Sequence, residues 1–571
     1  MGCAFQMCTS YRRRLTSGGV SVLGAEHWRV ALGVVSLLTL AGVPQAKALN
    51  LYTGIVSGQN LEIDLDTTVE YSNMFRVNSP SKVLTSNING NDGDLNFQHG
   101  MVDNTFDILP VLDVKYGSFG TGSFGLHVSG EAYLDTPYLG RTQNDSPSTY
   151  NPYSTDNRHF TSATRNVNGE NAVLLDAFVY GTKYFGAQGQ QTFTLKVGRQ
   201  TLLWGQSLYF PTNGIAGGMA PIDVIKADNL PNAQAQQVFL PVGQVVATYS
   251  PNPNLTFQGY YQFEWEPDTL QGVGSYFSTT DILDKGGQRI IGVPGGSFYP
   301  GSPGYYMYRV KDLRPPVNNG QFGFAVQGTV GQFDLGLYAL RYDSKSPEGV
   351  YTGGLTSFFG NPVPANYWVV YPRDIQLYGA SFSTTYAGVN IAGEVSGRRN
   401  MPLVSVAAPY TSYPSSANAG ALYPVGSTYA AQISAIYVSP GIPLDPGGVT
   451  ISGEFAMNHV LSVDKNKAAL EPGRDNTAGA FAVVITPTYD SVLPSLNLTF
   501  PIGIHYNLFG RSQIDSTMNH GTGYVNVGVT ATYRTVWTAS LTYQDYLGRP
   551  DPTLNPLADR GYVAFSIQRT F

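Results

Sequence analysis

Charge is the scarcest property of this chain. Asp, Glu, Lys and Arg make up 13% of its 571 residues, against about a quarter in an ordinary soluble domain. Its two cysteines, Cys3 and Cys8, both lie in the N-terminal leader. The rest of the chain therefore has no disulfide framework, no cysteine-ligated zinc and no thiol nucleophile.

No apolar run is long enough for a membrane-spanning helix. The run at residues 30–43 has 14 residues, whereas a spanning helix needs about 20. It follows Arg12, Arg13, Arg14 and Arg29, and Ala46-Lys47-Ala48 comes shortly after it. This pattern predicts a secretory signal peptide over residues 1–48, cleaved between Ala48 and Leu49. A signal anchor is the alternative, and a later translation start remains open.

Glycine, proline and aromatic residues are abundant instead. The chain has 65 glycines and 36 prolines, and its aromatic content is 12%. So many helix breakers exclude a long helical bundle, and the aromatic content excludes a disordered chain. Without the leader, 28 basic residues stand against 38 acidic ones. A balance this acidic argues against nucleic-acid binding, which needs clustered Lys and Arg.

Segments of about ten residues alternate between apolar and polar side chains. In residues 255–266, Leu255, Phe257 and Phe263 fall on one face, while Gln258 and Glu264 fall on the other. Period-two alternation of this length predicts strands with one face in an apolar medium and one in water. The strands of soluble sandwiches are shorter, at about five or six residues.

Eighteen such segments follow one another, and short and long connections alternate strictly between them. We place them near residues 61–71, 103–116, 123–135, 172–183, 190–199, 242–250, 254–266, 320–330, 332–343, 374–386, 389–399, 427–438, 448–459, 477–489, 494–506, 523–534, 536–546 and 560–571. The pattern predicts an all-β, antiparallel transmembrane barrel over residues 49–571, with short periplasmic turns and long extracellular loops. Sixteen strands is the alternative count.

The C-terminus has its own pattern. Residues 561–571 alternate and include Phe565, Ile567 and the terminal Phe571. This pattern resembles the signal that the bacterial barrel-assembly machinery recognises. We therefore expect that machinery, outer-membrane lipid and lipopolysaccharide as partners, and the outer membrane of a Gram-negative bacterium as the location.

Several longer phrases carry a family resemblance. They are VGRQTLLWGQSLYF at 197–210 with the sequence that follows it, NDGDLNF at 91–97 and GEVSGRRNMPL at 393–403. The chain resembles the domain-of-unknown-function 1302 family of bacterial outer-membrane proteins over nearly all of its length after the leader. The resemblance implies a barrel of unassigned substrate and transfers no catalytic residue.

The connection at residues 200–241 is unusually apolar for a surface loop. Ile215, Met219, Ile222, Leu230 and Phe239 illustrate its composition. Because an exposed loop of this kind would promote aggregation, we expect it to fold into the barrel and constrict the lumen. The alternatives are that it props the wall or caps the extracellular mouth.

The expected constriction residues mix aromatic, polar and charged types. They are Arg199, Trp204, Gln206, Tyr209, Asp223, Lys226 and Asp228. Trp204 and Tyr209 could stack a flat ligand, and an interfacial anchor is the alternative for Trp204. A second group should lie at the lumen mouth: Glu264, Glu266, Arg398 and Arg399. The two arginines would pair with lipopolysaccharide phosphates or with loop carboxylates.

Catalytic and metal motifs are weak. His127 shares a strand face with Ser129 and Glu131, but no nucleophile motif surrounds them. The stretch NGNDGD at 89–94 has oxygen ligands spaced like a calcium loop and lacks the bidentate glutamate. A tight turn is the better interpretation of it. No metal and no cofactor are expected.

These patterns together predict a channel for the passive passage of small, hydrophobic molecules, not an enzyme. The segment 200–241 would be its internal constriction. One alternative is a general porin with a mild cation preference, which acidic lumen residues would produce. Another is a structural or adhesive barrel that acts through its extracellular loops, with FYPGSPGYYMY at 298–308 as the contact.

Overall fold

The computed structural model describes residues 49–118, 122–186, 189–231, 233–283, 285–316, 320–406, 408–409, 423–440 and 447–571. The leader and Ala48 lie outside these residues, so the signal peptide and its cleavage site remain predictions.

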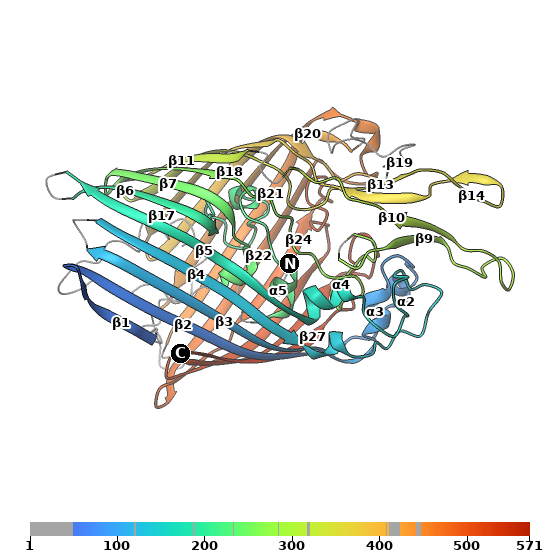
Figure 1. Ribbon diagram of the computed structural model, residues 1–571, viewed down its shortest axis with the longest axis horizontal. Coiled ribbons are helices and arrows are strands. Elements are labelled where there is room, and N and C mark those ends of the chain that lie inside the picture. The colour runs from blue at the N-terminus through green and yellow to red at the C-terminus, as the bar shows by residue number, and fades with distance from the viewer. Residues whose placement is uncertain are drawn as a thin grey trace.

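A closed antiparallel barrel of 18 strands forms the body of the described residues (Figure 1). Its wall runs through β2 (Gln59–Arg76), β3 (Gly100–Ser118), β4 (Gly122–Asp135), β5 (Glu170–Phe185), β6 (Gln191–Gln200), β7 (Val242–Asn252), β8 (Leu255–Gln262), β11 (Gln321–Val330), β12 (Phe333–Tyr342), β17 (Ile375–Tyr386), β18 (Val389–Pro402), β20 (Val425–Val438), β21 (Val449–Lys465), β22 (Thr477–Leu493), β23 (Leu496–Thr499) with β24 (Ile502–Phe509), β25 (Gly523–Tyr533), β26 (Trp537–Leu547) and β27 (Tyr562–Thr570). Pairing of β2 with β27, from Thr68↔Thr570 to Arg76↔Tyr562, closes the ring.

The predicted strand count is confirmed, and the alternative of sixteen is wrong. Two details differ from the predicted segments. The segment 494–506 is divided into β23 and β24 around Pro501, which cannot donate a ladder hydrogen bond. The strand expected to reach residue 266 ends as β8 at Gln262, so Glu264 and Glu266 lie beyond it.

An additional strand, β1 (Leu49–Val56), forms a hairpin with the first wall strand. Leu49 pairs with Leu65 and Val56 with Gln59, so β1 covers the first part of β2 and β27 covers the rest. Phe571 lies past the end of β27, and its backbone N–H donates to Thr67 O at 3.0 Å. The terminal residue predicted as an assembly signal is therefore fixed at the barrel seam.

The two faces of the wall differ in polarity. On β4, Phe124, Leu126 and Leu134 are 70, 36 and 41% exposed, while Ser129 and Glu131 of the opposite face are buried. This is apolar-out, polar-in alternation, as expected for a barrel whose outer face contacts lipid.

Short turns gather at one end of the barrel and long loops at the other (Figure 1). Ala387 and Gly388, with φ of 49° and 82°, join β17 to β18 in two residues, the left-handed pair that tight hairpins require. The long-loop end carries the small helices α2 (Lys82–Thr85), α3 (Asp92–Asn96), η1 (Thr136–Leu139), α4 (Ser162–Thr164), η2 (Arg165–Gly169) and η4 (Lys467–Ala469).

The long loops also build sheets of their own, which the sequence pattern did not predict. A five-stranded sheet has the order β19 (Ala408–Pro409), β13 (Gly349–Gly353), β16 (Asn366–Val370), β10 (Tyr305–Arg309) and β9 (Arg289–Val293). A hairpin of β14 (Thr356–Phe358) and β15 (Asn361–Val363) extends beyond it. Among the described helices, none is both long and apolar enough to cross a membrane.

Candidate functional site

The connection between β6 and β7, residues 201–241, lies inside the barrel, and we refer to it as the lumen segment. It contains η3 (Ile215–Gly218), α5 (Val224–Asn229) and α6 (Ala235–Val238), and Figure 1 shows α5 within the ring of strands. Lys226 contacts Asp107 on β3, whereas Arg398 on β18 contacts Gly214. Because β3 and β18 lie nine strands apart in the 18-strand ring, the segment crosses the full width of the lumen.

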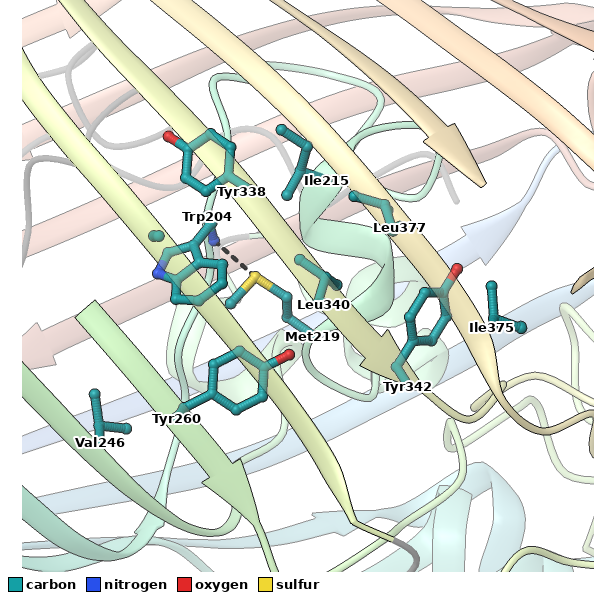
Figure 2. Packing of buried hydrophobic residues seen from close by; sticks show 11 residues of the cluster. Trp204, Ile215, Met219, Val246, Tyr260, Tyr338, Leu340, Tyr342, Ile375 and Leu377 are labelled. Atoms are coloured by element: carbon teal, nitrogen blue, oxygen red, sulfur yellow. Dashed lines mark hydrogen bonds between the residues drawn. The ribbon is translucent and has the colours of Figure 1, made fainter. Parts of the chain in front are cut away.

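An apolar cluster attaches the first half of the segment to the wall (Figure 2). Trp204, Ile215 and Met219 of the segment pack among side chains of β7, β8, β11, β12 and β17. The wall residues are Val246, Tyr260, Ala325, Tyr338, Leu340, Tyr342, Ile375 and Leu377. The apolar residues that suggested a lumen-folded loop are therefore used for packing.

Trp204 is the centre of this cluster. Its side chain is 1% exposed, and its indole N–H donates to Gln258 Oε1 at 2.6 Å. The ring lies 5.1 Å from that of Tyr260 and 5.8 Å from that of Tyr338. Neither expectation for Trp204 is correct, because the ring is enclosed and can neither stack a ligand nor sit at a lipid interface.

Glu394 on β18 holds two points of the segment at once. Its carboxylate accepts the backbone N–H groups of Gln206, at 2.5 Å, and Ile215, at 2.8 Å. Gly205 and Gly214 flank these points, and a Cβ on either would overlap the carboxylate. Both glycines are therefore needed for the backbone to approach Glu394 this closely.

Glu454 on β21 binds the next turn of the segment. Its carboxylate accepts the backbone N–H groups of Leu208, Tyr209 and Phe210. The Tyr209 hydroxyl lies 2.6 Å from Ser452 Oγ. Tyr209 is thus fixed against the wall by both its backbone and its hydroxyl, although its ring stays partly exposed.

Arg398 and Arg399 have different surroundings. Arg398 is 4% exposed, and its guanidinium donates to the carbonyls of Asn213, at 3.0 Å, and Gly214, at 2.6 Å. Arg399 is exposed on the outer face. The expectation that Arg398 pairs with a phosphate or a loop carboxylate is wrong, because its contacts are carbonyls of the lumen segment.

On the opposite wall, Lys226 of α5 forms a buried ion pair. Its Nζ lies 3.3 Å from Asp107 Oδ2 and 2.7 Å from Glu131 Oε1. The same ammonium stands 3.6 Å from the centre of the Tyr133 ring. Gln237 of α6 also donates to Glu131, at 2.6 Å. The ion pairs of Lys226, its contact with the Tyr133 ring and the hydrogen bond of Gln237 together fix α5 and α6 to β3 and β4.

The remaining acidic residues of the segment contact the segment itself and the loop that follows β8. Asp223 is the N-cap of α5 and accepts from Lys226 N at 3.0 Å. Asp228 accepts from Gln271 Nε2 of the following extracellular loop at 3.1 Å. Both contacts are structural.

Two loop residues hold the middle of the segment from the extracellular side. Lys345 Nζ donates to Gly218 O at 3.1 Å, and Asp268 Oδ1 accepts from Ile222 N at 2.8 Å. Burial lowers the pKa of Lys345 to about 8, although Asp268 and Asp343 act in the opposite direction.

Arg199 and Glu264 form a pair at the extracellular rim. Arg199 Nη1 lies 2.5 Å from Glu264 Oε1, and Glu264 also accepts from Gly243 N. Arg199 has the same strand parity as Leu195 and the lipid-facing Val197. The structure therefore places Arg199 at the rim and not in the constriction, paired with Glu264, which was expected at the mouth. Glu266 is exposed beside them.

The lumen face of β2 to β5 is strongly acidic. By strand parity, ten carboxylates of the described residues point inward there. They are Glu62, Asp64, Asp66, Glu70, Asp103, Asp107, Asp113, Glu131, Asp135 and Asp176. Arg76, Lys115 and His127 are the basic groups of the same faces, and His127 Nδ1 lies 2.7 Å from Asp113 Oδ1. Toward the periplasmic end, Asp64, Asp66 and Asp113 remain partly exposed.

Ser129 and His127 do not form a catalytic pair. Ser129 Oγ accepts from Asp176 N at 3.1 Å, and His127 is bonded to Asp113. Within the described ranges, no group of three or more His, Cys, Asp and Glu residues is arranged to hold a metal ion.

A wall with an apolar outer face, long loops at one end and a folded segment across its lumen defines an outer-membrane type of β-barrel. The chain belongs to the family described as Protein of unknown function (DUF1302), which matches residues 28–571. The resemblance predicted from the sequence is thereby confirmed. Among curated proteins, no relative matches.

Solved outer-membrane barrels are similar to this chain at low identity. Acinetobacter baumannii OccAB3 has a TM-score of 0.42 and 10% identity, with 89% of this chain and 99% of that chain covered. A BenF-like porin from Pseudomonas fluorescens Pf-5 has a TM-score of 0.41 and 11% identity over 90% and 98%. Salmonella typhi OmpF in complex with daunomycin has a TM-score of 0.37 and 9% identity over 91% and 100%.

Sequence reasoning missed the two wall glutamates that anchor the segment. Glu394 and Glu454 each occupy a polar position in an alternating strand, so they are indistinguishable from solvated lumen residues. A usable signal was the pair of glycines at 205 and 214 inside an otherwise bulky, apolar loop.

Proposed function

We propose that the protein is an outer-membrane channel of a Gram-negative bacterium that passes small molecules passively. The observation that carries this proposal is the lumen segment, which spans the barrel from Lys226 on one wall to Glu394 and Glu454 on the other. An 18-strand barrel without such a segment would be a wide aqueous pore. The segment occupies part of that pore and would restrict passage through it.

The chemistry of the accessible lumen favours cationic passengers. The prediction of a hydrophobic passenger relied on an apolar surface offered by residues 200–241, and many of their apolar side chains, Trp204 among them, are packed in buried clusters. Asp64, Asp66 and Asp113 remain partly exposed on the acidic wall. A low-dielectric channel lined by one sign of charge concentrates ions of the opposite sign. We therefore propose a constricted channel that prefers small cations and cationic solutes to anions.

The reversal potential in a planar bilayer under a KCl gradient tests this preference. The wild-type protein should give a K⁺ to Cl⁻ permeability ratio above one. The triple variant Glu62→Gln, Asp64→Asn, Asp66→Asn should move the ratio toward one. A matched control, Glu170→Gln, Asp145→Asn, Asp156→Asn, removes the same charge from exposed extracellular positions and should leave the ratio near the wild-type value. A wild-type anion preference would contradict the proposal.

Contact with a partner outside the cell is a second candidate function. Phe298 and Phe359, 61 and 54% exposed, lie at the tips of two extracellular loops with their rings 5.4 Å apart. Phe359 holds a left-handed conformation, with φ of 48°, which is unusual for a bulky residue. If this tip is adhesive, trimming residues 285–312 abolishes cell-surface binding and leaves conductance unchanged. The reverse result favours the channel alone.

A further inference from the structure

Three extracellular loops meet at the carboxylate of Asp92, beside the first turn of α3. Asp92 N donates to Asp281 Oδ2 of the loop after β8 at 3.2 Å. Asn151 N of the loop after β4 donates to Asp92 Oδ2 at 3.1 Å. Two carboxylates from distant parts of the chain are therefore neighbours in a region shielded from water.

Several oxygens of this cluster accept no hydrogen bond, although the side-chain amide of Asn144 is a polar neighbour of the Asp92 carboxylate. They are Oδ1 of Asp92, Asp281, Asn91 and Asn151. Asp92, Asp281 and Asn151 are 0% exposed, and Asn91 is 2% exposed. Burying a carboxylate or amide oxygen without a donor is costly. Four such oxygens in one cluster are offset by a bound cation or by a proton shared between the two carboxyl groups.

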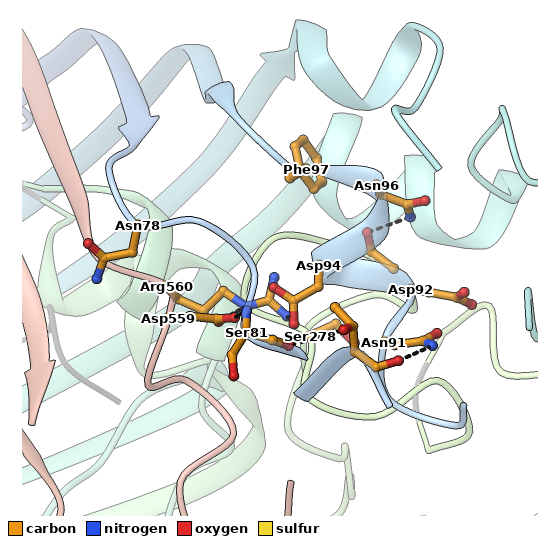
Figure 3. Close-up of polar contacts among 12 residues, drawn as sticks. Asn78, Ser81, Asn91, Asp92, Asp94, Asn96, Phe97, Ser278, Asp559 and Arg560 are labelled. Carbon is orange, nitrogen blue, oxygen red and sulfur yellow. Dashed lines mark hydrogen bonds and ion pairs between the residues drawn. The ribbon is translucent and has the colours of Figure 1, made fainter. Parts of the chain in front are cut away.

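The charges of Arg289 and Arg560 act on Asp92 and Asp281 through space, but the neighbouring arginines make their direct ion pairs with other carboxylates. Asp94, on the other side of α3, lies 2.8 Å from Arg76 Nη2 and 3.0 Å from Arg560 Nη2. Figure 3 shows Asp94 directed toward Arg560 and Asp92 directed away from it. Within the described part of the chain, no salt bridge reaches Asp92 or Asp281.

Arg289 also points elsewhere. Its Nε donates to Asn151 O at 2.8 Å, and its Nη2 donates to Tyr150 O at 3.0 Å. It orders the backbone of the loop after β4, and neither of these hydrogen bonds reaches a carboxylate. The net charge of the Asp92–Asp281 pair is thus not balanced by a direct contact.

We propose that Asp92, Asp281, Asn91 and Asn151 bind one calcium ion. Calcium takes six to eight oxygen ligands, and carboxylate and amide oxygens are its usual protein ligands. Magnesium demands a more rigid octahedral geometry, and zinc and copper prefer nitrogen or sulfur. Two carboxylates neutralise the double charge of the ion, and water or backbone carbonyls complete its shell.

The proposal also accounts for the motif at residues 89–94. Its oxygen spacing resembles a calcium loop, and the missing carboxylate ligand comes from Asp281, 189 residues from Asp92 in the chain. One ion would tie the loops after β2, β4 and β8 together at the extracellular mouth. The affinity expected for an extracellular site of this kind is about 10⁻⁴–10⁻³ M.

Calorimetric titration of the purified, folded full-length protein with CaCl₂, after treatment with a chelator, tests the site. We expect one saturable site in that range, binding at least tenfold weaker for MgCl₂, and an unfolding temperature that rises with calcium. Asp281→Asn should abolish both effects. The matched control Asp145→Asn, which alters an exposed carboxylate in the same loop as Asn151, should keep them.

Asn91→Asp covers the case in which Asp281→Asn fails to fold. It adds a carboxylate to the site and should tighten calcium binding by about tenfold, because ligand charge sets the affinity of such sites. The proposal is overturned if the wild-type protein shows no saturable calcium binding. It is also overturned if folded Asp281→Asn binds calcium as the wild type does, or if Asn91→Asp leaves the affinity unchanged.

Discussion

At the scale of single residues, hydrogen bonds from backbone N–H groups to wall carboxylates fix part of the lumen segment inside this barrel. Glu394 and Glu454 each accept several N–H groups of the lumen segment. A hydrogen bond to a charged group contributes about 1.5–3 kcal/mol. The two wall residues therefore bind the backbone of the segment, and these hydrogen bonds do not depend on which side chains the segment carries.

The close approach of the segment to Glu394 depends on Gly214. Its φ of −83° suits any residue, so the effect of a substitution is purely steric. Gly214→Ala would place a methyl group against the Glu394 carboxylate and break the N–H contacts of Gln206 and Ile215. We expect faster proteolysis within residues 202–219. Gly140→Ala, where a methyl group has only ordinary contacts, should behave as the wild type; equal rates in all three proteins would contradict this role.

Lys345 makes the stability of the segment depend on pH. Burial lowers its pKa to about 8 from the usual 10.5. Between these values the unfolded chain still carries a proton that the folded chain has lost, so stability rises with pH. The unfolding temperature of the wild type minus that of Lys345→Met should therefore increase from pH 8 to pH 10. A difference that stays constant over this range would show that the lysine is not buried.

At the scale of elements, the two halves of the lumen segment are attached by different means. Residues 202–219 use apolar packing and the wall glutamates, whereas α5 and α6 use the Lys226 ion pair and the Gln237 amide. Removing one partner of a buried ion pair costs about 3–5 kcal/mol. The two attachments can therefore be released separately.

Trp204→Ala tests the apolar attachment. Truncating a buried tryptophan costs about 3–5 kcal/mol, and it also leaves Gln258 without its indole donor. Urea unfolding in lipid or detergent should show a loss of this size. Trp537→Ala, at a side chain 38% exposed on the outer face, is the control and should lose less. Equal losses would mean that Trp204 is not a packing anchor.

The elements that the sequence predicted and those that it did not are stabilised by different kinds of contact. Wall strands repeat with period two because one face meets lipid, so their positions followed from alternation. The loop sheet of β9, β10, β13, β16 and β19 is stabilised by loop-to-loop contacts, which no local period reports. The break at Pro501 was visible in the sequence as a missing donor.

The candidate site was predicted less well than the wall. The composition of residues 200–241 correctly indicated a segment folded into the barrel. The direction of each side chain did not follow, because Trp204 and Arg398 face partners far away in the chain. Glu394 and Glu454 gave no signal of their own for the same reason, and only Gly205 and Gly214 hinted at a close approach to the wall.

At the scale of the whole molecule, the lumen segment crosses an 18-strand barrel. Under the proposed function, this segment limits the open cross-section of the channel. Its anchors on opposite walls imply that passage requires either the residual space beside it or its partial release. Single-channel conductance in planar bilayers measures this directly. The comparison is between the wild type, the double variant Glu394→Gln/Glu454→Gln and the control Glu170→Gln, whose side chain is exposed outside the lumen.

We expect small or rare openings in the wild type and in Glu170→Gln, unchanged by added hydrophobic solutes. The double variant should give a several-fold larger conductance with reduced cation selectivity, because the weakened contacts release the first half of the segment. A large, steady, ohmic conductance of the wild type, equal to that of the double variant, would contradict the account and make this protein an open general porin.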